Sequence, residues 1–397
     1  MTRHRSPLRR SLTATGCAQG PYRAPGATGC AQVRHGAAAA VGLLADRAFG
    51  EPPAAVHPVA VFGRVMTQLE RRVWRDSRLA GVAYAAAGVG VASLAGAGLS
   101  RTANAAFGRS AGAGLGRAAG LALRSSVPAG AVATWLVVAG RALGEEARAD
   151  GERLAADDLE GARRRLPALV GRDPDSLDAK EVARAVVESV AENTVDAVVA
   201  PACWAAMGGA VGAGFYRAVN TLDAMVGHRN ERYRQFGWAA ARVDDVANWI
   251  PARLTALLVA AVRPAHAREV LDALAHPPAH PSPNAGVAEA AFAAALGLRL
   301  GGDTVYAGRV DPRPTFGTGR TPEAADIDAA VRLSGDVTIA LAALLTAPAL
   351  LGAVPRRLTS TLVPQRNRSR SEPYRGLKRN RLRSGTAGAA PARQATI

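Results

Sequence analysis

The sequence predicts a mostly α-helical protein with four to five membrane-embedded helices. Of its 397 residues, 49% are hydrophobic and only 20% are charged, which is unusual for a soluble enzyme. Uncharged segments long enough to span a bilayer, which takes about 20 residues, occur at 79–100, 197–216 and 337–355. Strand signals are scarce, because alternation of β-branched residues is nearly absent. We therefore expect a multi-pass protein whose solvent is partly lipid.

The positive charge of the chain lies at its two ends. Residues 1–36 contribute +6 and residues 356–397 contribute +10 to a net charge of +17, which leaves +1 for the rest. A nucleic-acid binder is expected to carry basic residues interleaved with stacking aromatics on its folded part, and only 5% of this chain is aromatic. The distribution argues against a nucleic-acid partner and favours contact between the basic tail and anionic lipid.

Three parts follow from this distribution. We expect a disordered basic extension over 1–36, a single integral-membrane domain over 37–355 and a disordered basic tail over 356–397. Within the domain, an apolar run at 36–45 predicts a short first helix that is partly embedded in the membrane.

The remaining elements of the domain follow in order. The Gly- and Ala-rich segment at 79–100 suits close packing against other helices, and a shorter uncharged segment lies at 125–140. Apolar residues at helical spacing, with charges between them, predict a soluble helical hairpin over 141–184.

Three carboxylates stand directly before the apolar segment 197–216. Glu188, Glu192 and Asp196 are spaced i, i+4, i+8, so a regular helix would place them on one face, where like charges repel. Such a row is useful if it holds a divalent cation or a cationic group. Mg²⁺ prefers one or two protein carboxylates, which makes Glu192 and Asp196 candidate metal ligands. The alternative is a solvated helix end.

The densest polar run of the domain is 220–253. Arg229 and Arg242 suit carboxylate or phosphate clamps, because a guanidinium group donates two parallel hydrogen bonds. The alternative is an interfacial helix with ordinary ion pairs. The candidate site residues of this run are Asn220, Asp223, Arg229, Asn230, Glu231, Arg242, Asp244, Asp245, Asn248 and Arg253.

Two further polar clusters border apolar sequence, where ionisable groups are costly. His57, followed by a proline, is a candidate general base or phosphate donor, with a structural hydrogen-bonding role as the alternative. In the segment 280–302, Ser282 or Asn284 could cap a helix whose free N–H groups bind an anion, or could simply cap it. Glu289 lies in the apolar part of that segment.

A short repeat borders the apolar segment on both sides: NTVD at 193–196, which includes Asn193, and NTLD at 220–223. In one straight helix the repeats would lie about 40 Å apart. Pro201, Gly208 and Gly209 allow the path to bend. We expect the two repeats to converge on one site.

No familiar nucleotide-binding signature is present. The polar clusters contain the motifs HPV at 57–59, LVGRD at 169–173, ESVAENTVDAVVAP at 188–201, NTLDAMVGHRNERY at 220–233, FGWAAARVDDVANWIPARLT at 236–255 and HPSPNAGVAEAAFAAALGLRLGG at 280–302. In this order they resemble the adenosylcobinamide-phosphate synthase family of the cobalamin pathway. The resemblance covers roughly residues 38–355, and one departure is GEPP at 50–53, where the family usually has Gly-Asp-Pro.

The resemblance implies a multi-pass protein of the cell membrane that condenses a corrin propionate with (R)-1-amino-2-propanol or its O-phosphate. Amide formation from a free carboxylate needs activation, for which ATP with Mg²⁺ is the economical route. We expect the amide-forming chemistry at the following residues: Glu188, Glu192, Asp196, Asp223 and Arg229. The remaining candidates named above are expected to bind the corrinoid and the amino alcohol.

Two other functions stay open. A transporter would also place charges inside a helical bundle, although it would more often show hydropathy symmetry between two halves. A membrane scaffold that gathers other enzymes of the cobalamin pathway would need the apolar helices without the dense polar run.

Overall fold

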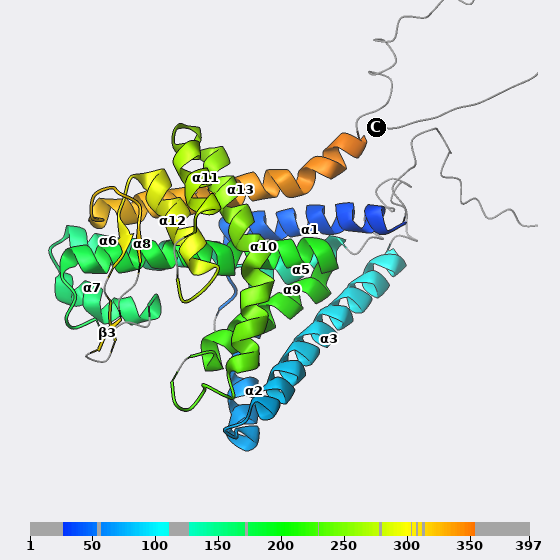
Figure 1. Ribbon diagram of the computed structural model, residues 1–397. Coiled ribbons are helices and arrows are strands. Elements are labelled where there is room, and N and C mark those ends of the chain that lie inside the picture. Colours follow the sequence, from blue (N-terminus) through cyan, green and yellow to red (C-terminus); the bar gives the residue numbers. More distant parts are fainter. Residues whose placement is uncertain are drawn as a thin grey trace, which may run out of the picture. The chain divides into compact units, whose positions relative to one another are not determined.

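The protein is a helical assembly, described here by a computed structural model, and the predicted fold class is confirmed (Figure 1). The structure describes residues 27–53, 57–110, 127–170, 174–228, 230–277, 280–302, 304–306, 309–311 and 314–353. The predictions of disorder for 1–26 and for 356–397 lie outside these residues.

The helices are α1 (Ala27–Phe49), α2 (Pro58–Val73), α3 (Arg78–Ser110), α5 (Val127–Val137), α6 (Gly140–Ala155), α7 (Leu159–Arg165), α8 (Ala179–Thr194), α9 (Ala200–Val226), α10 (Trp238–Val262), α11 (Ala267–Ala275), α12 (Ala285–Leu296) and α13 (Ala324–Ala353). A π-helical turn, Val195–Val199, joins α8 to α9. The strands form two antiparallel pairs, β1 (Leu300–Gly301) with β4 (Thr315–Phe316) and β2 (Thr304–Tyr306) with β3 (Arg309–Asp311).

Five helical stretches of the described chain are long and apolar enough to cross a membrane, which agrees with the predicted number. They are Arg78–Ala103, Val127–Ala155, Ala179–Val226, Trp238–Val262 and Ala324–Leu351. The protein is therefore a membrane protein by the length and composition of its helices.

The five candidate spans are not all the segments that we predicted to be embedded in the membrane. The first helix, α1, is not among them, and it already begins at Ala27. Residues 27–36, which we expected in the disordered extension, thus form the first turns of α1. Conversely, α10 is a candidate span, although it was not among the predicted apolar segments and an interfacial helix was the alternative for its polar first half.

Small residues bring α3 and α9 into close contact. A Cβ atom added at Gly214 would lie 2.6 Å from the carbonyl oxygen of Ala92, and one added at Gly96 would lie 2.3 Å from that of Ala210. Only glycine permits this approach of two backbones, as in other closely packed membrane helices. The Gly- and Ala-rich composition of 79–100 therefore has the packing role that we expected.

The segment 141–184 is helical as predicted, but it consists of most of α6, the short helix α7 and the start of α8. Helix α8 begins with a capping box, in which the Asp178 side chain accepts from the Glu181 N–H and the Glu181 side chain accepts from the Asp178 N–H. The main apolar core lies where α6, α7, α8 and α10 to α13 pack together. Residues 141–155 and 179–184 belong to the candidate spans Val127–Ala155 and Ala179–Val226, so the prediction of a wholly soluble hairpin is wrong.

Candidate functional site

The apolar segment 197–216 bends sharply at Gly209. This residue has φ 58° and ψ −141°, a conformation outside the helical region. A Cβ atom on Gly212 would lie only 2.0 Å from the carbonyl oxygen of Trp204, so the chain on one side of the bend packs on the chain on the other. The predicted interruption of this segment is confirmed, and it occurs at one of the glycines that we named.

The bend brings the two repeats together with the start of α10. The carboxyl groups of Asp196, Asp223 and Asp244 interact electrostatically with one another, and we call these three residues the aspartate cluster. Asp196 comes from the first repeat and Asp223 from the second, so the predicted convergence is confirmed. Three acids from three elements share one region.

Amide and hydroxyl groups hold Asp244 in place. Its Oδ2 accepts a hydrogen bond of 3.0 Å from Asn248 Nδ2, and its carboxyl group also accepts from Asn220. Asn248 is buried, and its Oδ1 accepts at 2.8 Å from the Tyr216 hydroxyl. Neutral donors thus orient a carboxylate without cancelling its charge, which leaves the cluster able to attract a cation.

Arg217 connects the aspartate cluster to a cavity of about 310 Å³ that Glu51, His57 and Arg217 line. Its guanidinium group donates to Asn220 Oδ1 at 3.3 Å and to the Val137 carbonyl oxygen. It also interacts electrostatically with Asp196 and Glu51. An arginine placed between a cavity and a row of acids can hold an anionic group next to them.

His57 has the structural role that we weighed against a catalytic one, and it also faces this cavity. It is the N-cap of α2, where its Nδ1 accepts from the Val59 N–H at 3.3 Å. Its Nε2 lies 3.7 Å from Glu51 Oε2. The acid of the GEPP element is therefore the neighbour of His57 in the cavity wall.

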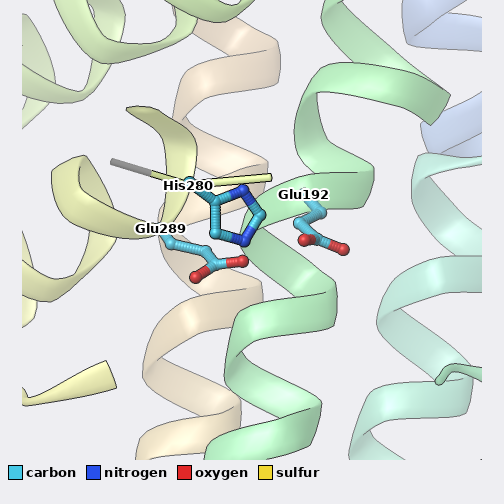
Figure 2. A group of neighbouring side chains, drawn as sticks. All are labelled: Glu192, His280 and Glu289. Atoms are coloured by element: carbon cyan, nitrogen blue, oxygen red, sulfur yellow. The ribbon is translucent and has the colours of Figure 1, made fainter. Parts of the chain in front are cut away.

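A second group of potential ligands lies beside the aspartate cluster. One ligand atom each from Glu192, His280 and Glu289 lies within 4.8 Å of the other two, and we call these residues the Glu-His-Glu triad. Figure 2 shows the imidazole ring between the two glutamate side chains, which come from α8 and α12. Glu192 also interacts electrostatically with Asp196, so the predicted metal ligands are near each other but belong to different groups.

Glu188 does not share this environment, although helical spacing placed it in one row with Glu192 and Asp196. Its Oε1 accepts at 2.7 Å from the backbone N–H of Gly301, and Arg184 Nε lies 4.0 Å away. The π-helical turn that contains Asp196 also changes the register of the row, because a π-helix has a wider turn than an α-helix. The three acids therefore have three different surroundings.

The contacts of Glu188 predict a structural effect of its removal. Glu188→Ala leaves the buried Gly301 N–H without its acceptor, so we expect the free energy of unfolding to fall by about 1–3 kcal/mol. Glu188→Gln keeps an acceptor oxygen and should cost less. Thermal unfolding of the two variants in detergent measures the difference, and equal losses would contradict a role for this hydrogen bond.

The start of α12 is tied to α10 by side chains that we expected to bind substrate. Asn284 Nδ2 donates to the Asp245 carbonyl oxygen at 2.8 Å, and Asn284 Oδ1 accepts from Arg253 at 2.9 Å. Arg253 also lies over the Trp249 ring. Ser282 Oγ accepts from two N–H groups at the start of α12, each at 3.3 Å, as a cap does. These contacts support the capping alternative for Ser282, whereas Asn284, the N-cap residue of α12, makes no capping hydrogen bond with its side chain.

Other predicted site residues have local partners or exposed positions. Arg242 pairs with Asp245 at 3.4 Å, one turn along α10. Asn193 donates to the Ser189 carbonyl oxygen at 3.0 Å, and Asn230 accepts from the Tyr233 N–H at 2.9 Å. Glu231 is exposed in the connection between α9 and α10. Arg229 lies outside the described residues, so its predicted role stays a prediction.

Arginines from α1, α6 and α13, and one that directly follows α10, line a cavity of about 600 Å³. They are Arg47, Arg141, Arg148, Arg263 and Arg332. Several of them pair with acids, for example Arg263 with Asp336 at 2.8 Å. The cavity borders α8 through Val190, and its positive wall suits an anionic ligand.

The sequence interpretation missed Arg217 and His280 as site residues. Arg217 is the only charged residue between Asp196 and Asp223 in the sequence, which was a usable signal. His280 opens the motif HPSPN, but its grouping with Glu192 joins residues far apart in the chain.

Comparisons with known proteins agree with the motif resemblance. The family described as CobD/Cbib protein matches residues 39–334. The cobalamin biosynthesis protein CobD of Mycobacterium tuberculosis is 46% identical over 299 residues, which cover 74% of this chain and 89% of that protein. The protein of the same name from Rhodobacter capsulatus is 39% identical and covers 72% and 88%, and that from Chromobacterium violaceum is 41% identical and covers 79% and 97%. No solved structure matches the chain.

Proposed function

Because this chain belongs to the CobD/Cbib family of cobalamin-biosynthesis proteins, we propose that it is an amide-forming ligase of that pathway. It joins (R)-1-amino-2-propanol or its O-phosphate to a propionate of adenosylcobyric acid, and the product is adenosylcobinamide or its phosphate. The convergence of Asp196, Asp223 and Asp244 next to the basic cavity wall at Arg217 is the observation that supports this proposal most.

The proposed reaction needs an activated carboxylate. A propionate oxygen attacks the γ-phosphorus of ATP, ADP leaves, and the amine nitrogen then attacks the acyl carbon and expels phosphate. The aspartate cluster offers only oxygen ligands, which is the donor type that Mg²⁺ prefers. Mg²⁺ would supply charge neutralisation for the phosphate groups there. The residues fit Mg²⁺ by their donor type, because carboxyl groups from three elements converge there.

The chain's own residues have distinct tasks in this proposal. Arg217 holds the propionate or phosphate group beside Asp196, because its guanidinium group lies between the cavity and the acids. Asn220 and Asn248 keep the Asp244 carboxylate oriented towards the cluster. The carboxylates also attract the ammonium group of the amino alcohol and can accept its proton before attack. Arg229 and the arginine-lined cavity are further candidates for phosphate binding.

The site lies among helices that are candidate membrane spans, so lipid would surround these helices in the cell membrane. The corrinoid would then enter the helical bundle from the membrane surface. Other enzymes of the pathway are candidate partners, because the product must pass to the next step.

The proposal is tested by incubating the purified protein in detergent with adenosylcobyric acid, the amino alcohol or its phosphate, and MgATP. Mass analysis of the corrinoid should show the mass gained by amide formation, and ADP should accumulate in equal amount. A transporter or scaffold would leave the corrinoid mass unchanged in detergent. Omitting ATP and omitting the amino alcohol are the controls.

A further inference from the structure

The Glu-His-Glu triad has the composition of a transition-metal site. We propose that Glu192, His280 and Glu289 bind one divalent first-row transition ion, such as Zn²⁺, Mn²⁺, Fe²⁺ or Co²⁺, at a site separate from the one for MgATP. Imidazole nitrogen with carboxylate oxygens is a donor set for these ions, whereas Mg²⁺ favours oxygen alone. The inference does not depend on the amide-forming reaction.

The spacing of the three ligand atoms suits one ion. All three lie within 4.8 Å of one another, whereas two ligands of a tetrahedral ion bound at about 2.0–2.2 Å lie about 3.5 Å apart, so binding draws the side chains together. Glu192 is only partly buried, so its side chain has room to rotate towards an ion. Three protein ligands leave further positions of the ion open to water or to a substrate group.

The histidine ring is held in place by its surroundings. His280 Nδ1 lies 3.0 Å from the Ser282 carbonyl oxygen and 3.1 Å from the Ser282 backbone nitrogen, so it can donate to the first or accept from the second. In the tautomer whose Nδ1 proton is donated to the carbonyl oxygen, Nε2 carries a lone pair that can bind a metal ion. The ring packs against Phe316, with 5.9 Å between ring centroids. Gly286 permits this placement, because a Cβ atom there would lie 2.7 Å from the Cβ of His280.

The charge of the triad also favours a cation. Glu289 is 2% exposed and lies within the apolar helix α12, where an ionised carboxylate is costly unless positive charge or hydrogen bonds compensate it. Together with Glu192 it brings two carboxyl groups to one place. A divalent ion bound there would link α8, α12 and the segment before α12.

The test is metal binding by the full-length protein in detergent, purified without a histidine tag. The protein is loaded with Co²⁺ or Zn²⁺ alone, free ion is removed by gel filtration, and the metal content is measured. We expect about one ion per chain, and for Co²⁺ a visible absorption band. Millimolar Mg²⁺ should not displace the ion. Failure of the amide-forming assay would leave this result unaffected.

Substitutions test whether the bound ion is held by the Glu-His-Glu triad or by other residues. His280→Asn and Glu289→Gln should each weaken Co²⁺ binding at least about 100-fold, because each removes a direct ligand. His276→Asn and Glu269→Gln, which alter exposed residues of the neighbouring sequence, should bind as the unaltered protein does. Gly286→Ala keeps all three ligands but displaces the His280 ring, so it should also weaken binding.

Circular dichroism identifies any variant that fails to fold. If a ligand variant is unstable, the Co²⁺ affinity of Gly286→Ala tests the proposal in its place. Two results would overturn the proposal. One is an unaltered protein that retains none of Zn²⁺, Mn²⁺, Fe²⁺ or Co²⁺. The other is unchanged stoichiometry and affinity in folded His280→Asn, which would leave the triad as a hydrogen-bonded group without metal.

Discussion

Gly209→Ala should abolish most of the amide-forming activity and lower the free energy of unfolding by about 1–3 kcal/mol. The backbone at Gly209 has φ 58° and ψ −141°, a region that residues with a Cβ atom rarely occupy. The added methyl group would also lie 3.2 Å from His35 Nε2. Because this bend brings Asp196 and Asp223 together, a shift of the backbone here disperses the aspartate cluster.

Gly208→Ala is the matched control for this prediction. No atom lies within 4 Å of a Cβ added at Gly208, and its backbone φ is not positive. Alanine is the better helix former, so this variant should be as stable as the unaltered protein or more so. Thermal unfolding and turnover are measured for both variants. Equal behaviour of the two would remove the bend from the explanation of activity.

Asp196→Asn and Asp244→Asn should each lower turnover by at least about 100-fold and raise the Mg²⁺ concentration needed for half-maximal activity. Each change removes one negative charge from the aspartate cluster and nearly preserves the shape of the side chain. Asp244→Asn also places an amide group where Asn248 and Asn220 donate to a carboxylate. A loss of cation affinity follows if the cluster holds Mg²⁺.

Asp272→Asn serves as the control, because this exposed acid on α11 is outside the candidate site. It should leave turnover and Mg²⁺ dependence unchanged. Steady-state assays over a Mg²⁺ titration distinguish a metal role from a structural one. If both cluster variants lost activity with an unchanged Mg²⁺ requirement, the acids would act by another route, such as binding the ammonium group.

Hydropathy and small-residue content were sufficient to predict the helical membrane fold, including the packing role of 79–100. The bend was predictable as well. The NT[VL]D element occurs on both sides of a Gly-rich apolar segment, and the two copies can form one site only if the chain reverses its direction between them. Helix α10 was not among the predicted apolar segments, because Arg242, Asp244 and Asp245 in its first turns lower its apparent hydropathy. Asp244, however, contacts Asn220 and Asn248 inside the protein.

The partners of the individual acids could not be predicted from periodicity. A regular helix places Glu188, Glu192 and Asp196 in one row, but the π-helical turn and tertiary contacts give each acid a separate environment. His280 joins Glu192 only through the packing of α12 on α8, which no local spacing encodes. The grouping of site residues therefore depends on long-range packing that the sequence pattern alone does not determine.

The convergence of the two repeats is tested most directly by a distance measurement between spin labels at Asn193 and Ala224. The labels are attached to cysteines introduced at these positions, in a background where Cys17, Cys30 and Cys203 are replaced by serine. With the bend at Gly209, both labels lie beside the aspartate cluster, and strong dipolar broadening is expected in the membrane-reconstituted protein. An unbent helix would separate them by about 46 Å, and spectra without broadening would contradict a shared site.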